Sequence, residues 1–337
     1  MKKLMLYLTG LVLVGFGFSA QAALTGFQTF NGNVGLSTDG FASSTNEGVI
    51  SAEVPSGATV LGAYLYTATY GITATPSVTL DGSGVTYGPR VPNATACCNL
   101  ASFRSDVTSL VKPTIDGGGG GVYNFDIAEA SFGSNTDGSA LVVVYEQASL
   151  PEATVGILDG FASVTGDNTS INFAEPLAPT DPGFFADMRL GISFSCCDQR
   201  SRVEVNRDLL TENAGNFDDA DQTFASNGHL FTMGGFDDAF SPDNPTYAQD
   251  TERYDLSGFV NAGDTSISVD TFNASQDDNI FLATFYVSGL AGVNEPPPPP
   301  NGDPGPGPGP IGVPEPAGIL LMLTGLLGLG YRRRGYA

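Results

Sequence analysis

Two acidic clusters flank the only histidine in the chain, His229. Each cluster is built on the sequence Phe-Asp-Asp-Ala, and carboxylate oxygens are the ligands that calcium prefers, about six to eight at a time. The candidate calcium ligands are Asp218, Asp219, Asp221, Asp237 and Asp238. Because their spacing is not that of an EF-hand loop, a solvated acidic loop without metal is the alternative. Calcium is the one cofactor that the sequence suggests.

The four cysteines form two adjacent pairs, Cys97 with Cys98 and Cys196 with Cys197. Four cysteines allow three disulfide connectivities, and a bond between neighbouring cysteines strains the backbone. We therefore favour two bridges that join the pairs, formed in a compartment that oxidises thiols. A zinc site is a poor match, because zinc motifs usually place about two to four residues between paired ligands.

No group of residues predicts catalysis. The chain has one histidine and lacks a Gly-x-Ser-x-Gly elbow, a His-Glu-x-x-His motif and a phosphate-binding loop. A carboxylate pair of the glycoside hydrolase kind could be drawn from the 36 acidic residues, but nothing in the sequence selects one. We therefore assign no catalytic residue and do not expect an enzyme.

Aromatic residues allow a second kind of chemistry, the stacking of sugar rings. The candidate stacking residues are Tyr64, Tyr66, Tyr70, Phe184, Phe185, Phe231 and Phe236. Tryptophan, which offers the largest aromatic face, is absent. The even spacing of the three tyrosines places them on one face of a strand, and a ladder within a sheet explains them equally well.

The elements that must position these residues are β-strands. Residues 122–127 and 267–272 alternate apolar and polar side chains, as in strands with one buried face. Residues 140–145 are continuously apolar, which predicts a central core strand. The pattern predicts an all-β fold of antiparallel sandwiches. Residues 138–146 and 157–161 resemble β-sandwich modules of bacterial surface proteins, which implies a jelly-roll or immunoglobulin-like architecture.

Five landmarks occur twice in the same order, which predicts a duplicated body. They are Asp-Gly-Phe-Ala-Ser at 39–43 and 159–163, alternating runs at 63–70 and 188–195, the cysteine pairs, aspartate-hydrophobic segments at 105–111 and 254–260, and two closing strands at 121–130 with 140–146 and 265–272 with 279–287. We therefore predict two tandem sandwich modules, residues 23–150 and 151–292. The second half is longer after its cysteines, so we interpret residues 198–253 as an acidic insertion. Residues 293–312 form a linker rich in Pro and Gly, which favours an extended chain.

The first 22 residues predict a secretory signal peptide. Two lysines precede an apolar stretch at residues 4–18, and Ala20 and Ala22 supply the small residues that signal peptidase reads. We therefore expect cleavage before Ala23.

The chain ends with three features in a fixed order. They are Val-Pro-Glu-Pro at 313–316, an apolar run at 317–331 and three arginines at 332–334. A helix of about 15 residues rises only about 22 Å, so the run predicts one short, marginal transmembrane helix. Clustered arginines stay on the cytoplasmic side, which leaves the Pro-Glu-Pro outside. A permanent single-span tail is the alternative to a signal that is removed.

This order of features resembles the PEP-CTERM sorting signal of Gram-negative bacteria. The residues that carry the resemblance are Val313, Pro314, Glu315 and Pro316, followed by the short apolar helix and the arginines. The resemblance covers residues 313–337 and implies processing by an exosortase at or near the Pro-Glu-Pro. It also implies an association with exopolysaccharide and with biofilm or floc matrix.

Charge limits the partners of the exported body. The whole chain carries a formal net charge of −23, from 13 basic and 36 acidic residues. Removal of the five basic residues in the two signals leaves eight, so the mature charge is near −28 with Glu315 counted. Such a body is repelled by nucleic acid and by anionic membranes, and it attracts divalent cations.

These features predict a protein exported across the inner membrane of a Gram-negative bacterium to the cell surface or extracellular matrix. We expect a structural or adhesive role in an exopolysaccharide or biofilm matrix. The alternative is a lectin-like module that recognises a specific polysaccharide. The expected partners are signal peptidase and exosortase during export, with transient membrane anchoring, and then extracellular polysaccharide or other matrix components, but no nucleic acid.

Overall fold

The computed structural model describes the body of the chain. The described residues are 23–43, 45–93, 99–129, 135–163, 165–194, 200–215, 231–240, 252–273 and 279–299. Within these ranges the chain forms mainly β-strands, together with helix α1 (Thr108–Asp116) and the single 3-10 turn η1 (Ser257–Phe259). All strand pairings in this part of the chain are antiparallel, which confirms the prediction of a mainly β, antiparallel fold.

Two sheets come mostly from the first half of the chain. Sheet C has four strands in the order β3 (Glu47–Val54), β9 (Gly121–Glu129), β5 (Val78–Leu80) and β6 (Ser83–Gly84). Sheet B has five strands in the order β2 (Val34–Ala42), β10 (Thr136–Glu146), β4 (Thr59–Thr69), β8 (Ala101–Asp106) and β7 (Val91–Pro92).

The other two sheets come mostly from the second half. Sheet A has six strands: β1 (Thr25–Gly32), β11 (Ala153–Asp159), β19 (Asn279–Ser288), β13 (Ala186–Ser193) and β16 (Phe231–Met233) in order, with β17 (Arg253–Asp255) also paired to β13. Sheet D has five strands in the order β15 (Asp208–Gly215), β14 (Arg200–Val205), β18 (Ser266–Phe272), β12 (Asp167–Phe173) and β20 (Ala291–Val293). Strand β1 is therefore an early segment of the chain that completes a sheet of the later half.

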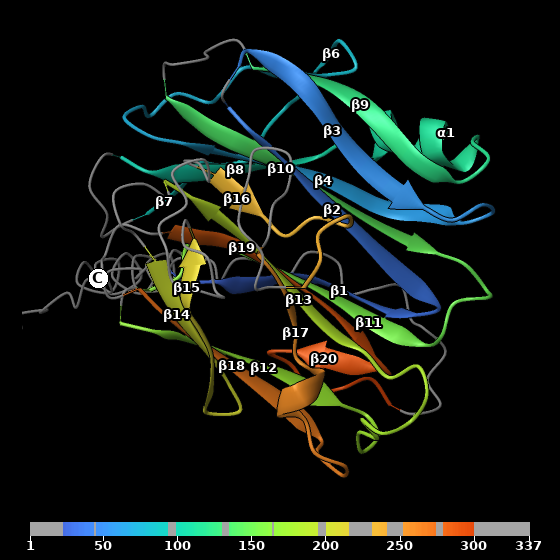
Figure 1. Ribbon diagram of the computed structural model, residues 1–337. Coiled ribbons are helices and arrows are strands. Elements are labelled where there is room, and N and C mark those ends of the chain that lie inside the picture. Colours follow the sequence, from blue (N-terminus) through green and yellow to red (C-terminus); the bar gives the residue numbers. More distant parts are fainter. Residues whose placement is uncertain are drawn as a thin grey trace, which may run out of the picture.

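The sheets are stacked as layers in the order C, B, A and D (Figure 1). A separate hydrophobic core fills each space between neighbouring layers. The core between C and B contains Phe125, the core between B and A contains Phe161 and Phe281, and the core between A and D contains Ile267 and Phe285. Sheets B and A are thus covered on both faces, whereas sheets C and D each present one face to solvent.

Double coverage explains the continuously apolar strand. β10 lies between β2 and β4 in sheet B, and its residues Ala140 to Val144 are 0% exposed. A strand with both faces buried cannot alternate apolar and polar residues, because each face meets a core. The prediction of a central core strand at this place is confirmed.

The strand pairing of one half is repeated in the other. The order β2-β10-β4-β8 in sheet B matches β11-β19-β13-β17 across sheet A, and β3-β9-β5-β6 in sheet C matches β12-β18-β14-β15 in sheet D. A helical turn follows the matching strands β8 and β17, as α1 and η1. The internal repeat that the sequence landmarks predict therefore appears as a repeated pattern of pairing.

Residues 198–253 are only partly an insertion. Within them, β14 and β15 pair with each other and β14 pairs with β18, so both strands belong to sheet D. They hold the place that β5 and β6 hold in sheet C. The second cysteine pair precedes β14 in the chain, whereas the first precedes β8, so aligning the halves on cysteines assigned two framework strands to the extra segment.

Candidate ligand-binding face

The exposed face of sheet D carries polar side chains at regular intervals. Along β12 and β18 every second residue is buried, as Ile171 and Ile267 are, and the residues between them face outward. The outward residues oppose one another in three cross-strand pairs: Asn168 and Asp270, Ser170 and Ser268, and Asn172 and Ser266. The two-residue period of a strand therefore produces a ladder of amide, hydroxyl and carboxylate groups.

Hydrogen bonds hold one end of this ladder in place. The Nδ2 of Asn168 donates to Ser268 Oγ and to Asp270 Oδ1, both at 2.8 Å. The hydroxyl of Ser268 also donates to the other Asp270 oxygen at 3.4 Å. The side chains are thus oriented before a ligand binds, which lowers the entropy lost on binding.

The other end of the ladder is held by the segment that follows β20. The Nδ2 of Asn172 donates to Ser170 Oγ at 3.1 Å and to the backbone carbonyl of Glu295 at 3.0 Å. Asn294 Oδ1 accepts the backbone N–H of Ser170 at 2.8 Å. The polar face therefore extends beyond the strands of the sheet to residues 294 and 295.

An ion-pair group forms the side of the face on β14 and β15. Arg202 donates to Glu204 through Nε at 2.9 Å, and it is also paired with Glu212. The hydrogen bond that Arg202 donates to the Glu204 carboxylate is the main cause that raises the pKa of Arg202. The two carboxylates therefore occupy the guanidinium of Arg202.

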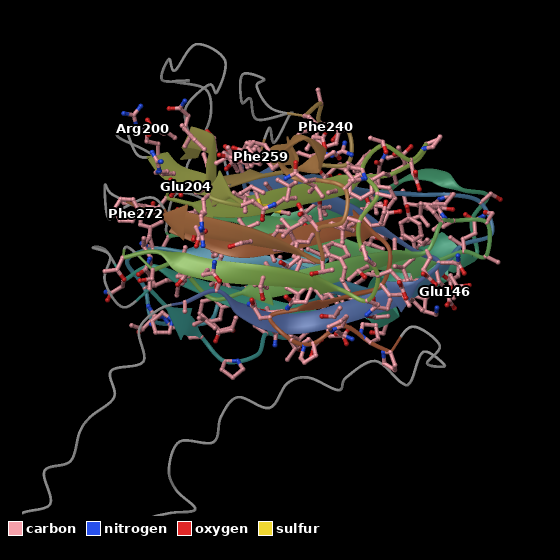
Figure 2. The ribbon with its side chains drawn as sticks, turned by 90° about the horizontal axis from the view of Figure 1, so that it is seen from below. Glu146, Arg200, Glu204, Phe240, Phe259 and Phe272 are labelled. Carbon is pink, nitrogen blue, oxygen red and sulfur yellow. The ribbon has the colours of Figure 1, made fainter. Side chains whose placement is uncertain are left out.

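Two hollows lie at opposite ends of the ladder. The first, of about 640 Å³, is lined by Thr165, Gly166, Asp167, Asn168, Arg202, Glu204, Asp270, Thr271 and Phe272. The second, of about 560 Å³, is lined by Ser170, Asn172, Phe173, Thr265, Ser266, Asn294, Glu295, Pro296 and Pro297. Asn172 follows Asn168 by four residue steps along β12, a rise of about 13 Å. Figure 2 shows Glu204 and Phe272 on the same side of the molecule, and Phe272 is 41% exposed.

A third hollow, of about 330 Å³, adjoins the second because both are lined by Phe173. The segment between β12 and β13 forms its wall and is fixed by backbone hydrogen bonds, including Leu177 N–H to Asp264 C=O at 2.7 Å. Its apolar surface comes from Phe173, Leu177, Phe184, Leu290 and three prolines, Pro151, Pro176 and Pro182. An apolar cleft with a few polar groups is the usual form of a small-molecule site.

A buried ion-pair network lies elsewhere, between sheets A and B. The guanidinium of Arg189 binds Asp187 through Nε at 3.2 Å and Nη2 at 3.0 Å, and it donates to Thr38 Oγ1 at 3.0 Å. Arg253 binds the same carboxylate at 2.9 Å and donates to the backbone carbonyl of Asp238. These bonds attach residues 236–238 to the sheets, which is a structural role.

Two buried carboxyl groups lie where the end of β9 in sheet C meets the start of β10 in sheet B. Glu129 and Asp137 are each 1% exposed, and burial is the main cause that raises the pKa of both groups. Glu129 accepts hydrogen bonds from the hydroxyls of Ser43 and Ser139, which lower its pKa in part. Both carboxyls are enclosed by the protein, so their arrangement favours a structural role.

The two described members of the predicted calcium group have different environments. Asp237 is exposed, whereas Asp238 is 5% exposed and accepts the backbone N–H of Gly235 at 3.0 Å. Both lie near Asp39, because their charges contribute to its raised pKa. Among the described residues, no three His, Cys, Asp or Glu side chains come together as a metal site requires.

Most other predicted site residues lie outside the described ranges. These are Asp218, Asp219, Asp221, His229, the four cysteines Cys97, Cys98, Cys196 and Cys197, the signal-peptide residues Ala20 and Ala22, and the sorting-signal residues Val313, Pro314, Glu315 and Pro316. Ala23 is the first described residue. Neither α1 nor η1, the helices of the described part, has the length and hydrophobicity of a membrane span, and residues 317–331 lie outside that part.

The structure separates the aromatic sugar-stacking candidates. Tyr64, Tyr66 and Phe231 are 6%, 1% and 3% exposed and belong to the core between sheets B and A, so they cannot form a stacking surface. Tyr70 lies against Phe194, and Phe185 lies against Tyr286. Phe236 is half-buried, and Phe184 lines the third hollow. The even spacing of Tyr64 and Tyr66 reflects a core ladder.

Sequence reasoning did not identify the ladder of sheet D. The only local signal for the ladder is that polar residues alternate with apolar ones in residues 267–272. This pattern predicts an outward face but does not identify the neighbouring strand. The ladder is completed by β12, about a hundred residues earlier, so only strand pairing reveals it.

Comparisons with known proteins give no further identification. No protein-family model, no curated protein and no solved structure matches this chain.

Proposed function

We propose that the protein is an exported structural or adhesive component of an exopolysaccharide or biofilm matrix, and that the exposed face of sheet D holds the polysaccharide. The observation that carries this proposal is the ladder of preoriented amide, hydroxyl and carboxylate groups with a hollow at each end. Sugar hydroxyls both donate and accept hydrogen bonds, so they match such a surface. The exposed ring of Phe272 adds an apolar surface for a sugar ring.

The shape of the face favours a chain over a single sugar. The hollows are about 13 Å apart along the same strand pair, and the polar groups between them are continuous. An extended polymer could occupy both hollows at once, and linked contacts raise the effective affinity.

In this proposal the linker and the two terminal signals place the β-sheet body outside the cell. The two predicted sandwich modules, residues 23–150 and 151–292, form the body, except that β1 of the first module completes sheet A of the second. The linker at 293–312 separates the body from a surface. The signals at 1–22 and 313–337 direct export across the inner membrane and exosortase processing. The proposed export and processing are supported by the sequence patterns at the two ends of the chain.

Lectin-like recognition of one particular polysaccharide is the second candidate function. The fixed positions of Asn168 and Asp270 favour it, because hydrogen-bonded side chains discriminate between arrangements of hydroxyl groups. A purely mechanical matrix protein needs no such discrimination.

Retention of the secreted mature protein on immobilised exopolysaccharide from its own cells tests the proposal. We expect saturable binding that soluble polysaccharide competes away. Asn168→Ala should weaken binding about tenfold through the loss of a sugar contact and of the order in the ladder. Asn124→Ala, on the exposed face of sheet C, is the matched control and should bind as the wild type does. Equal loss in both variants, or no retention, overturns the assignment to sheet D.

Mass spectrometry of the secreted form tests the export part separately. We expect an N-terminus at Ala23 and a C-terminus at or near Pro314 to Pro316. A secreted chain that keeps both Met1 and Ala337 contradicts it.

A further inference from the structure

The charges around the three hollows have one sign. The first hollow is lined by Asp167, Glu204 and Asp270, and the second by Glu295. The third is lined by Glu152, Glu175 and Asp181. Each hollow therefore presents at least one carboxylate to whatever binds there.

The single basic residue among the linings does not reverse this sign. Arg202 lines the first hollow, and its guanidinium is paired with both Glu204 and Glu212. An anionic sugar would have to compete with these two carboxylates. The hollows are therefore net negative even where an arginine is present.

The third hollow adds an apolar surface to this charge. Phe184, Leu177 and the prolines form one side, and Glu175 and Asp181 lie on the exposed wall segment between β12 and β13. Phe173 lines both the second and the third hollow, and the polar ladder of sheet D runs from the second hollow to the first. We call the three hollows and the ladder together the track. A sugar ring with a positively charged substituent fits an apolar surface edged by carboxylates.

We propose that the polymer held by this track is rich in amino sugars with free, protonated amines. This inference rests on the proposed function and names the chemical class of its ligand. Opposite charges in contact attract in water, and they attract more strongly where the surface excludes water. The net charge of the mature body, near −28, draws a cationic polymer toward the track and repels an anionic one.

Binding of defined oligosaccharides to the secreted mature protein tests the ligand class. The probes are a glucosamine oligomer, its N-acetylated counterpart, and an oligogalacturonate with and without calcium chloride, at mildly acidic pH and two salt concentrations. We expect the glucosamine oligomer to bind at least about tenfold more tightly than its N-acetylated counterpart. Its affinity should fall as salt rises, because exposed charges are screened.

A paired variant locates the effect. Glu175→Gln combined with Asp181→Asn removes two carboxylates from the third hollow and should weaken binding of the glucosamine oligomer about tenfold. The same variant should leave binding of the N-acetylated oligomer unchanged. Glu53→Gln combined with Asp126→Asn, which removes two exposed carboxylates from sheet C, is the control for net charge and should change neither affinity.

The outcomes separate this inference from the proposed function. If the glucosamine oligomer and its N-acetylated counterpart bind equally well and Asn168→Ala weakens both, the amino-sugar assignment is overturned. Sheet D then remains the polysaccharide-binding face. Preferential binding of the oligogalacturonate in the presence of calcium also overturns it. Failure of every probe and of the exopolysaccharide itself overturns the proposed function. Equal loss of binding in the sheet C control variant and in the paired variant shows unspecific charge attraction and rejects the track.

Discussion

The exposed faces of sheets C and D hold the same place in the two repeats but carry different side chains. Sheet C exposes Val49 and Val122, which are 49% and 54% exposed, beside the carboxylate of Asp126 and one hydrogen-bonded pair, Ser51 and Asn124. Sheet D exposes the ladder of amides, hydroxyls and Asp270, with Phe272 at the end of β18. A repeat constrains the inward residues, because each sandwich must fill its own core, and leaves the outward residues free to differ. Because the two faces differ in this way, we assign polysaccharide binding to the exposed face of sheet D.

The largest expected effect tests whether the inward faces are equivalent. Phe125 in sheet C and Ile267 in sheet D are 1% and 0% exposed, so truncation of either to alanine leaves a cavity. We expect Phe125→Ala to lower the free energy of unfolding by about 3–5 kcal/mol and Ile267→Ala by about 2–5 kcal/mol, measured by denaturant unfolding. Val122→Ala, on the exposed face, should stay within about 0.5 kcal/mol of the wild type. A small effect of Ile267→Ala beside a large effect of Phe125→Ala would show that the two sandwiches are not equivalent.

The next effect concerns a feature that the two halves do not share. Strand β13 carries the buried pair Asp187 and Arg189, whereas the matching strand β4 carries core tyrosines. We expect Asp187→Ala to reduce the free energy of unfolding by about 3 kcal/mol, because two arginines lose their carboxylate partner. Removal of an exposed partner by Glu212→Ala should change stability by less than about 1 kcal/mol. Equal effects in thermal unfolding would contradict a buried network.

The aspartates of the two Asp-Gly-Phe-Ala-Ser segments, Asp39 and Asp159, can be compared through the pH dependence of stability. Burial, opposed by the hydrogen bond from Ser51 N–H and strengthened by the charge of Asp237, raises the pKa of Asp39 to about 7. Burial also raises the pKa of Asp159, its counterpart in the second half, although the ion pair with Arg104 opposes the rise. A carboxyl whose folded pKa is raised gives stability that is fully present below its ordinary pKa of about 4 and is lost as pH rises through its folded value.

We therefore expect wild-type stability to fall between about pH 4 and pH 8, with Asp39 as one of the contributing carboxyl groups. Asp39→Asn should flatten that part of the profile, measured as the unfolding midpoint at each pH. Asp159→Asn serves as the comparison and should keep the slope due to Asp39. A profile unchanged by Asp39→Asn would show that this carboxyl does not titrate in that range.

The smallest effect separates the exposed faces directly. Phe272→Ala removes the exposed ring beside the first hollow and should weaken polysaccharide binding about fivefold, because an aromatic contact contributes about 1 kcal/mol. Val122→Ala on sheet C should leave the affinity unchanged. Titration calorimetry with the same polysaccharide measures both, and a reversed order would place binding on sheet C.

Local patterns in the sequence were sufficient to predict the mainly β, antiparallel character of the fold and several individual strands. The period-2 alternation at residues 122–127 and 267–272 appears as β9 and β18, and the apolar run at 140–145 appears within β10. These predictions succeed because side-chain direction alternates within one strand, whatever its partner. The cysteine pairs were a poor guide to the repeat, because they precede β8 in one half and β14 in the other.

The sequence by itself determined the mainly β, antiparallel character of the body and its strongly negative charge, since both depend on residue types and on spacing within single strands. Only the tertiary structure decided which strands pair and which faces remain exposed. It buried Tyr64 and Tyr66, and it brought Asn168 against Asp270 across 102 residues of chain. The physical reason is that a strand specifies two faces but not its neighbours, and the stacking of four layers decides which of those faces meets water.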